Sequence, residues 1–156
     1  MEKMEKIVVQ ASEYDLVDGR NAGHSRVKKL TLGAPRLPEN QQMEVAAQLW
    51  RENEEGELEV AAELAIHQVF DLMLLLSRTL LYFKDAYRMP LLYDPENPLV
   101  ERIGVQGGAL PVEICLDNPA IQQDIQQFSQ SLSNLGELTG ERLRRLTAIL
   151  DELKLY

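Results

Sequence analysis

The stretch LAIHQVFDLMLLLSRTLLYFK, residues Leu64 to Lys84, decides the fold. Its apolar residues cover nearly every side of a helical wheel, so we expect a helix here that the rest of the domain encloses. The uninterrupted apolar run is only five residues long, and His67, Asp71 and Arg78 fall inside the span. A bilayer-spanning helix needs about 20 predominantly apolar residues. The stretch therefore predicts a central core helix and no membrane span.

Length, charge and cysteine usage limit the class of protein. The chain has 156 residues, enough for one domain with a substantial core, and a formal net charge of -9. That charge repels nucleic-acid phosphates and anionic lipids, so we expect neither as a partner. Cys115 is the single cysteine, and the N-terminus lacks the apolar core of a signal peptide. We expect a cytoplasmic protein in which Cys115 is a small buried hydrophobe.

The segments before the central helix predict a small antiparallel sheet. Residues Ile7 to Arg26 are expected to form an irregular arm or loop, because their Gly, Asn, Asp and Ser residues favour turns. A strand is predicted from Val27 to Leu32. A hairpin is predicted from Glu44 to Arg51, through the turn NEEGE, to Leu58–Ala61; a helix is the alternative for its first arm.

The segments after the central helix predict a second hairpin and two helices. Strands are expected at Arg102–Gln106 and Leu110–Leu116, with a glycine bend between them. Asn118 before Pro119 predicts the start of a helix that continues to about Ser133. A last helix is expected over about Gly140 to Leu155. Together these elements predict a single α+β domain over residues 1–156, with a mostly antiparallel sheet packed against the central buried helix and a C-terminal helical hairpin.

No motif in the chain specifies a reaction. His67 and Asp71 stand four residues apart on one helical face, as a base and its orienting carboxylate would, but no third partner lies nearby. A structural polar pair is the preferred interpretation. The chain has no nucleophile elbow, and GVQGGAL lacks the Lys-Ser/Thr of a phosphate-binding loop. We therefore predict no catalytic residues, no metal site and no cofactor, and leave enzymatic activity open.

A ligand site is predicted where loop tyrosines and loop cations occur together. The densest positive cluster of this acidic chain is Arg20, His24, Arg26, Lys28 and Lys29, with Arg36 slightly later. Tyrosine can stack on a planar ring, and arginine can grip a phosphate or carboxylate. Alternatively, Tyr87 and Tyr93 cap the edge of the core while Arg88 pairs with Asp85 or Asp94. The predicted ligand-binding residues are Tyr14, Arg20, His24, Arg26, Tyr87, Arg88, Tyr93, Gln106, Gly107 and Gly108.

Three segments carry a resemblance to a known family: YDLVDGR (14–20), YRMPLLYD (87–94) and IGVQGGALPVEIC (103–115). With them the chain resembles a small, uncharacterised, bacterial and phage-associated family classed as a domain of unknown function. The similarity extends to LAIHQVFDL and GERLRRL. The family brings no activity, cofactor or catalytic residues, and it implies a whole, self-contained domain.

Three functional hypotheses follow from these patterns. The first is a non-enzymatic protein that binds a small anionic ligand, a nucleotide or nucleotide-derived signal, as anti-defence proteins that sequester such signals do. The second is a homo-oligomeric protein-interaction module built on the Leu143, Leu146, Leu150 and Leu153 seam. The third is a hydrolase that uses His67 and Asp71. The three hypotheses can be distinguished by different measurements.

Overall fold

The computed structural model describes residues 6–35 and 45–154. The chain divides into two compact units, residues 1–74 and 75–156. The first unit contains a four-stranded sheet, and the second contains a two-stranded sheet and two complete helices. One further helix, α1 (Ile66–Asp85), begins in the first unit and ends in the second. The predicted α+β class is confirmed.

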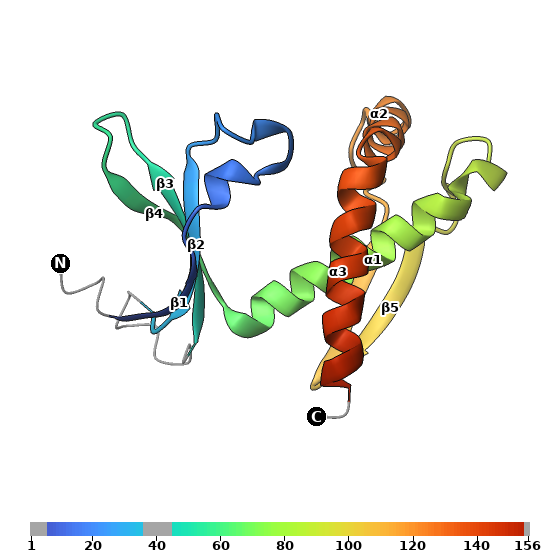
Figure 1. Cartoon of the computed structure of the whole chain (residues 1–156). Coiled ribbons are helices and arrows are strands. Elements are labelled where there is room, and N and C mark those ends of the chain that lie inside the picture. The colour runs from blue at the N-terminus through green and yellow to red at the C-terminus, as the bar shows by residue number, and fades with distance from the viewer. Residues whose placement is uncertain (1–5, 36–44, 155–156) are drawn as a thin grey trace. The chain divides into compact units, whose positions relative to one another are not determined.

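The first unit is an antiparallel sheet with the strand order β1-β2-β3-β4 (Figure 1). Its strands are β1 (Ile7–Ala11), β2 (Val27–Gly33), β3 (Ala46–Glu52) and β4 (Leu58–Ala65). Within the described residues, the first arm of the predicted hairpin is a strand and not the alternative helix; Glu44 lies outside them. The turn between β3 and β4 also follows the prediction, since the Asn53 side chain accepts hydrogen bonds from the N–H groups of Glu55 and Glu57.

The beginning of the chain corrects one prediction. Residues Ile7–Ala11 are not an irregular arm but a strand, in which Val9 pairs with Leu32 and Ala11 with Leu30. The β-branched run is short, but the free edge of β2 supplies the hydrogen-bond partners that it needs. The residues that follow keep the expected turn character as two short 3₁₀ helices, η2 (Tyr14–Leu16) and η3 (Gly19–Asn21).

One face of this sheet carries a buried hydrogen-bond network. The Trp50 indole N–H donates to Thr31 Oγ1 at 2.9 Å, and Thr31 Oγ1 donates to Gln48 Oε1 at 2.9 Å. Gln48 Nε2 then donates to Glu63 Oε2 at 2.6 Å. Thr31, Gln48 and Trp50 are each at most 5% exposed. The Lys29 ammonium lies 4.8 Å from the centroid of the Trp50 ring. The network links β2, β3 and β4 through side chains as well as through the backbone.

The central helix corrects a second prediction. None of the residues of α1 is buried, and Phe70 and Leu72 are 60% and 52% exposed. A helical wheel shows how apolar each side of a helix is. Whether those side chains are buried depends on which other elements pack against the helix. The enclosed core helix is therefore not observed. Among the described residues, no helix combines the length and apolarity that a membrane span requires.

In the second unit, a hairpin is followed by two helices. The strands β5 (Leu99–Val105) and β6 (Gly108–Glu113) pair antiparallel, and Gly107 occupies the turn with a φ of 90°. After α1 comes the short helix η4 (Ala86–Arg88), and after the hairpin come α2 (Ile121–Asn134) and α3 (Gly136–Leu153). The predicted break LSNLGELTG is confined to Leu135, because the residues from Gly136 onward already continue as α3.

Candidate functional site

The residues predicted to bind a ligand belong to both compact units. Tyr14, Arg20, His24 and Arg26 belong to the first unit, and the others belong to the second. None of them lines either of the two hollows described below. Arg36, the last cation of the predicted cluster, lies outside the described residues. The predicted ligand site stays a prediction.

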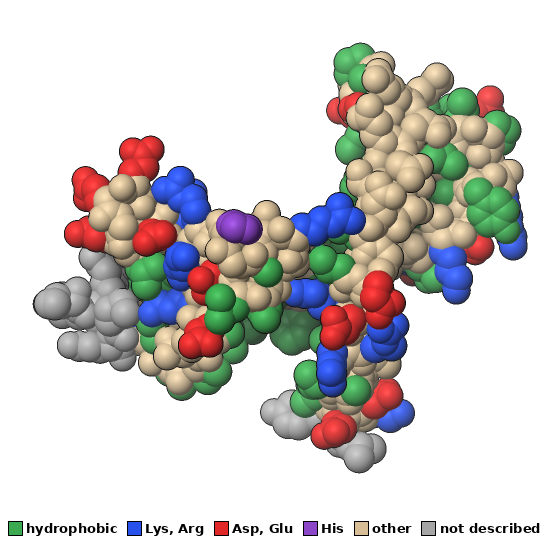
Figure 2. All heavy atoms as spheres, turned by 45° about the horizontal axis from the view of Figure 1, so that its top comes forward, with side chains coloured by type: hydrophobic (Ala, Val, Ile, Leu, Met, Phe, Trp, Pro, Cys, Tyr) green, Lys and Arg blue, Asp and Glu red, His purple; other side chains and the backbone are tan. Residues whose placement is uncertain are grey.

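Two members of the predicted basic cluster, Lys28 and Arg26, bond to neighbouring residues of the first unit, and only the Lys28 bonds are to carboxylates. The Lys28 ammonium lies 3.4 Å from an Asp15 carboxylate oxygen and 3.9 Å from a Glu52 carboxylate oxygen. The Arg26 Nε–H donates to the Glu52 carbonyl at 3.2 Å. On the face shown in Figure 2, basic side chains also lie beside acidic ones. The sequence shows how many cations the cluster contains, but it does not show that the fold brings Asp15 and Glu52 next to Lys28.

The predicted residues of the second unit differ in their exposure. Tyr87 is 73% exposed, whereas Tyr93 is 4% exposed, as expected for the alternative interpretation of Tyr93 as a core residue. Gln106, Gly107 and Gly108 are exposed at the hairpin turn. The burial of Tyr93 leaves Tyr87 as the accessible ring of that pair.

The polar pair on α1 does not form a defined site. His67 is exposed and Asp71 is half-buried, and the structure shows no hydrogen bond between them. Neither residue lines a hollow. Among residues 6–35 and 45–154, no three His, Cys, Asp or Glu side chains are grouped as metal ligands would be.

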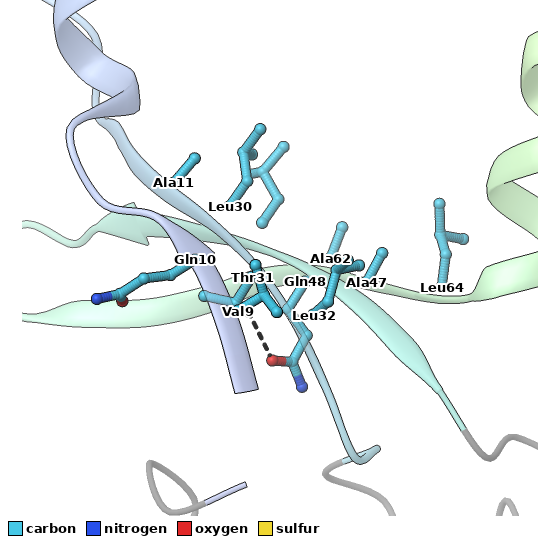
Figure 3. Close-up of a pocket in the computed structure, with 11 residues that line it drawn as sticks. Val9, Gln10, Ala11, Leu30, Thr31, Leu32, Ala47, Gln48, Ala62 and Leu64 are labelled. Atoms are coloured by element: carbon cyan, nitrogen blue, oxygen red, sulfur yellow. Dashed lines mark hydrogen bonds between the residues drawn. The ribbon is translucent and has the colours of Figure 1, made fainter. Parts of the chain in front are cut away.

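The first hollow lies on the sheet of the first unit, on the face opposite the buried network. It has a volume of about 490 Å³. Figure 3 shows Leu30 and Leu64 on one side of the strands and Gln48 on the other, where it bonds to Thr31. We call it the sheet hollow, and its lining residues are Val9, Gln10, Ala11, Leu30, Thr31, Leu32, Ala47, Gln48, Leu49, Ala62 and Leu64.

The second hollow lies in the second unit, between α1, the β5–β6 hairpin and α2. It has a volume of about 350 Å³, within the size range of small-molecule sites. We call it the helix–hairpin pocket. Its lining residues are Leu75, Thr79, Tyr82, Phe83, Val100, Val112, Glu113, Ile114, Cys115, Asn118, Ile121, Asp124, Ile125 and Phe128.

The lining residues of the helix–hairpin pocket on β6 and α2 follow the regular spacing of a strand and of a helix. On β6 and the residue that follows it, Val112 is buried and Ile114 half-buried, which is the alternation of a strand with one covered face. On α2, the lining residues Ile121, Asp124, Ile125 and Phe128 follow the three-four spacing of one helical face. Both periodicities are visible in the sequence, but neither shows that the two walls leave a hollow between them.

Aromatic rings and a few polar groups complete this pocket. The Phe83 ring contacts the Phe128 ring edge to face at 5.4 Å between centroids, and the Tyr82 ring at 5.2 Å. The Tyr82 hydroxyl donates to the Leu92 carbonyl at 3.2 Å. Burial, and to a lesser extent the Asp94 charge, raise the pKa of Tyr82 above its ordinary value. The hydroxyl therefore stays protonated, and remains a donor, at neutral pH.

Cys115 corrects a further prediction. The thiol is exposed and lines the helix–hairpin pocket, so it is not the buried hydrophobe that its apolar neighbours suggested. The reason is local: β6 ends at Glu113, and Cys115 lies in the segment between the strand and the turn before α2. The alternation of buried Val112, exposed Glu113 and half-buried Ile114 continues past the strand and puts Cys115 on the exposed side with Glu113.

The two hollows differ in chemical character. Most of the side chains that face the sheet hollow are aliphatic, whereas the helix–hairpin pocket combines aliphatic and aromatic walls with hydroxyl, amide and carboxylate groups. Small-molecule sites are typically apolar concavities with a few polar groups that fix the orientation of the ligand. The helix–hairpin pocket is therefore the candidate functional site.

Comparison with known proteins places the chain in a family but supplies no activity. No curated protein and no solved structure matches it. A family model does match, over residues 1–156. The chain belongs to a family of unknown function, DUF6530.

Proposed function

We propose that the protein is a non-enzymatic binding protein that holds a small, largely apolar ligand in the helix–hairpin pocket. One observation supports the proposal most strongly: three separate elements, α1, the β5–β6 hairpin and α2, line a partly open, apolar concavity with aromatic walls and a few polar groups. All of its lining residues belong to the second unit.

The polar side chains of the pocket support binding more than catalysis. The Thr79 hydroxyl donates to the Leu75 carbonyl, and the Tyr82 hydroxyl donates to the Leu92 carbonyl. The Asn118 amide donates to Asp124 at 3.0 Å. These bonds are made to backbone carbonyls or within the rim of the pocket. None of them joins a nucleophile to the base that would activate it.

The nucleotide ligand predicted from the loops is a separate proposal. It rests on the loop cations of the first unit and on the loop tyrosines, not on the helix–hairpin pocket, which no Lys, Arg or His lines. A nucleotide in this pocket would lack cationic partners for its phosphates. A titration with AMP tests the nucleotide proposal beside the one made here.

The first test uses 2-phenylethanol as an uncharged probe. We expect it to bind with a Kd on the order of 1 mM, given its few heavy atoms. Ile121→Trp, which adds bulk at a half-buried lining position, should weaken binding at least about tenfold because the indole competes with the probe for the same volume. The measurement is an NMR titration of ¹⁵N-labelled protein.

Gln122→Trp is the matched control, because Gln122 is the next residue of α2, is exposed and does not line the pocket. This variant should bind the probe as the unmodified chain does. Equal binding by the Ile121→Trp and Gln122→Trp variants, or no shift of the pocket amides in the unmodified chain, would contradict the proposal.

We also propose self-association through α3 as a second candidate function. No residue of α3 is buried, and Leu150 and Leu153 of its leucine seam are 45% and 52% exposed. Residues with the spacing of Leu143, Leu146, Leu150 and Leu153 lie on one side of a helix, as in helices that pair with one another. A second copy of the chain is the partner that this seam would take.

The seam predicts a specific effect on mass. Changing Leu146 and Leu150 together to Gln should convert a dimer, at twice 17.7 kDa, into a monomer, because the seam loses the apolar contacts that would hold two copies together. Sedimentation velocity measures the mass, and Arg144→Gln, on exposed α3 surface outside the seam, is the control. An unmodified chain that sediments as a monomer would exclude this candidate.

A further inference from the structure

We propose that the ligand of the helix–hairpin pocket is a hydrophobic cation: an ammonium group on an aromatic or aliphatic body. This inference rests on the proposed function, because it names the chemical class that the same pocket selects. The charge, the hydrogen-bond capacity and the aromatic walls of the pocket each support it.

The charge of the lining favours a cation. Asp124 occupies the same face of α2 as Ile121, Ile125 and Phe128, so its carboxylate stands at the edge of the apolar wall. Glu113 is the other acidic lining residue, and no lining residue is basic. A carboxylate beside a low-dielectric wall attracts a cation and disfavours a bound anion.

The N-terminus of α2 does not reverse this preference. A helix N-terminus attracts anions through its unbonded N–H groups and its dipole. Here the Ala120 N–H donates to the Asn118 side chain, and the Ile121 and Asp124 N–H groups donate to backbone carbonyls. The Asp124 carboxylate in the first turn already supplies the negative charge that this helix end favours.

The hydrogen-bond capacity of the pocket favours a ligand that donates. The hydroxyl hydrogens of Thr79 and Tyr82 are already directed to carbonyls. One hydrogen of the Asn118 amide is directed to Asp124 Oδ2, whereas Asp124 Oδ1 accepts no hydrogen bond from residues 6–35 or 45–154. The remaining capacity is therefore mainly that of acceptors. An ammonium group offers three donors and no acceptor.

The aromatic walls suit the apolar body of the same ligand. Phe83, Phe128 and Tyr82 are all lining residues, and the three rings form a contiguous edge-to-face cluster. Aromatic side chains offer a large apolar surface, and rings pack against one another edge to face or offset. A cationic head near Asp124 could place its apolar body against these rings.

The test compares three probes with the same phenyl body: 2-phenylethylamine, 2-phenylethanol and 3-phenylpropanoate. At pH 7 the amine is protonated and the acid is ionised. We expect the amine to bind about tenfold more tightly than the alcohol, because of the Asp124 carboxylate, and the carboxylate probe to bind more weakly than either. NMR titration of the full-length chain gives the three Kd values.

Asp124→Asn removes the charge but keeps the shape and an amide oxygen for the bond with Asn118. This variant should bind the amine within about twofold of its affinity for the alcohol, while its affinity for the alcohol stays unchanged. Asp117→Asn is the matched control, since Asp117 lies just before α2, is exposed and does not line the pocket. It should keep the tenfold preference.

The outcomes separate this inference from the proposed function. If the alcohol binds in the pocket and the amine shows no advantage, or if Asp124→Asn keeps the preference, the cation inference is wrong and the binding function stands. If none of the three probes shifts the pocket amides of the folded chain, the proposed function fails together with it.

Discussion

Thr31→Val is expected to lower the free energy of unfolding of the first unit by about 2–4 kcal/mol, because it leaves two buried polar groups without their partner. The hydroxyl of Thr31 accepts a hydrogen bond from the Trp50 indole and donates one to Gln48, and all three residues are buried. Valine has nearly the same shape and suits a β-strand, so the expected loss comes from the two hydrogen bonds.

Thr31→Ser is the informative control, because serine keeps the hydroxyl and removes only a methyl group. It should cost about 1 kcal/mol, less than Thr31→Val. Trp50 is the only tryptophan of the chain, so urea unfolding followed by its fluorescence reports on the sheet directly. A valine variant as stable as the serine variant would show that the network contributes little.

Gly33→Ala is expected to separate β1 from the sheet, with a loss of about 2–4 kcal/mol, more than overpacking usually costs, because the clash is with backbone. A Cβ atom at Gly33 would lie 2.1 Å from the Lys6 carbonyl oxygen and 3.0 Å from the Ile7 Cα. These are backbone atoms at the start of β1 and of the residue just before it, so they cannot turn aside as a flexible side chain could.

Hydrogen exchange of the β1 amides measures this effect most directly. The amides of Ile7–Ala11 should lose their protection in Gly33→Ala. They should keep it in Gly104→Ala, where a Cβ atom on β5 meets nothing within 4 Å. Unchanged protection of β1 in the Gly33 variant would mean that the strand pairing shown here is incorrect.

The strands and helices follow from local sequence signals, with instructive exceptions. The NEEGE turn and the glycines between β5 and β6 lie where their turns were predicted, because each signal acts over a few residues. The helix predicted from Pro119 begins two residues later, at Ile121, because Pro119 and Ala120 form a turn in which the Asn118 side chain accepts a hydrogen bond from the Ala120 N–H. The strand β1 was missed because its partner, β2, is supplied by a segment more than ten residues away. Pairing across such a distance leaves no local pattern.

The central helix shows the limit of helical periodicity. The apolar positions of α1 predict that a helix forms, but they do not predict which of its sides other elements will bury. The chain places α1 at the division between its two units, and none of its residues is buried. Whether residues 1–156 act as one domain stays a prediction.

The candidate site could be predicted only in part. The Ile121, Ile125 and Phe128 stripe and the alternation of Val112 and Ile114 are visible in the sequence, but stripes of this kind usually indicate core. That the stripes leave a pocket of about 350 Å³ depends on the packing of α1, the hairpin and α2 together. The cations of the basic cluster, by contrast, are conspicuous in the sequence, but the sequence does not show that one of them, Lys28 on β2, pairs with Asp15 and Glu52.

The central claim is that the helix–hairpin pocket is the ligand site. Intermolecular NOEs between the phenyl protons of bound 2-phenylethylamine and the protein test it most directly. We expect NOEs to the rings of Phe83 and Phe128 and to the methyl groups of Val112 and Ile125. NOEs to Leu30, Leu49 and Leu64 of the sheet hollow instead, or none from the bound probe to the pocket, would contradict it.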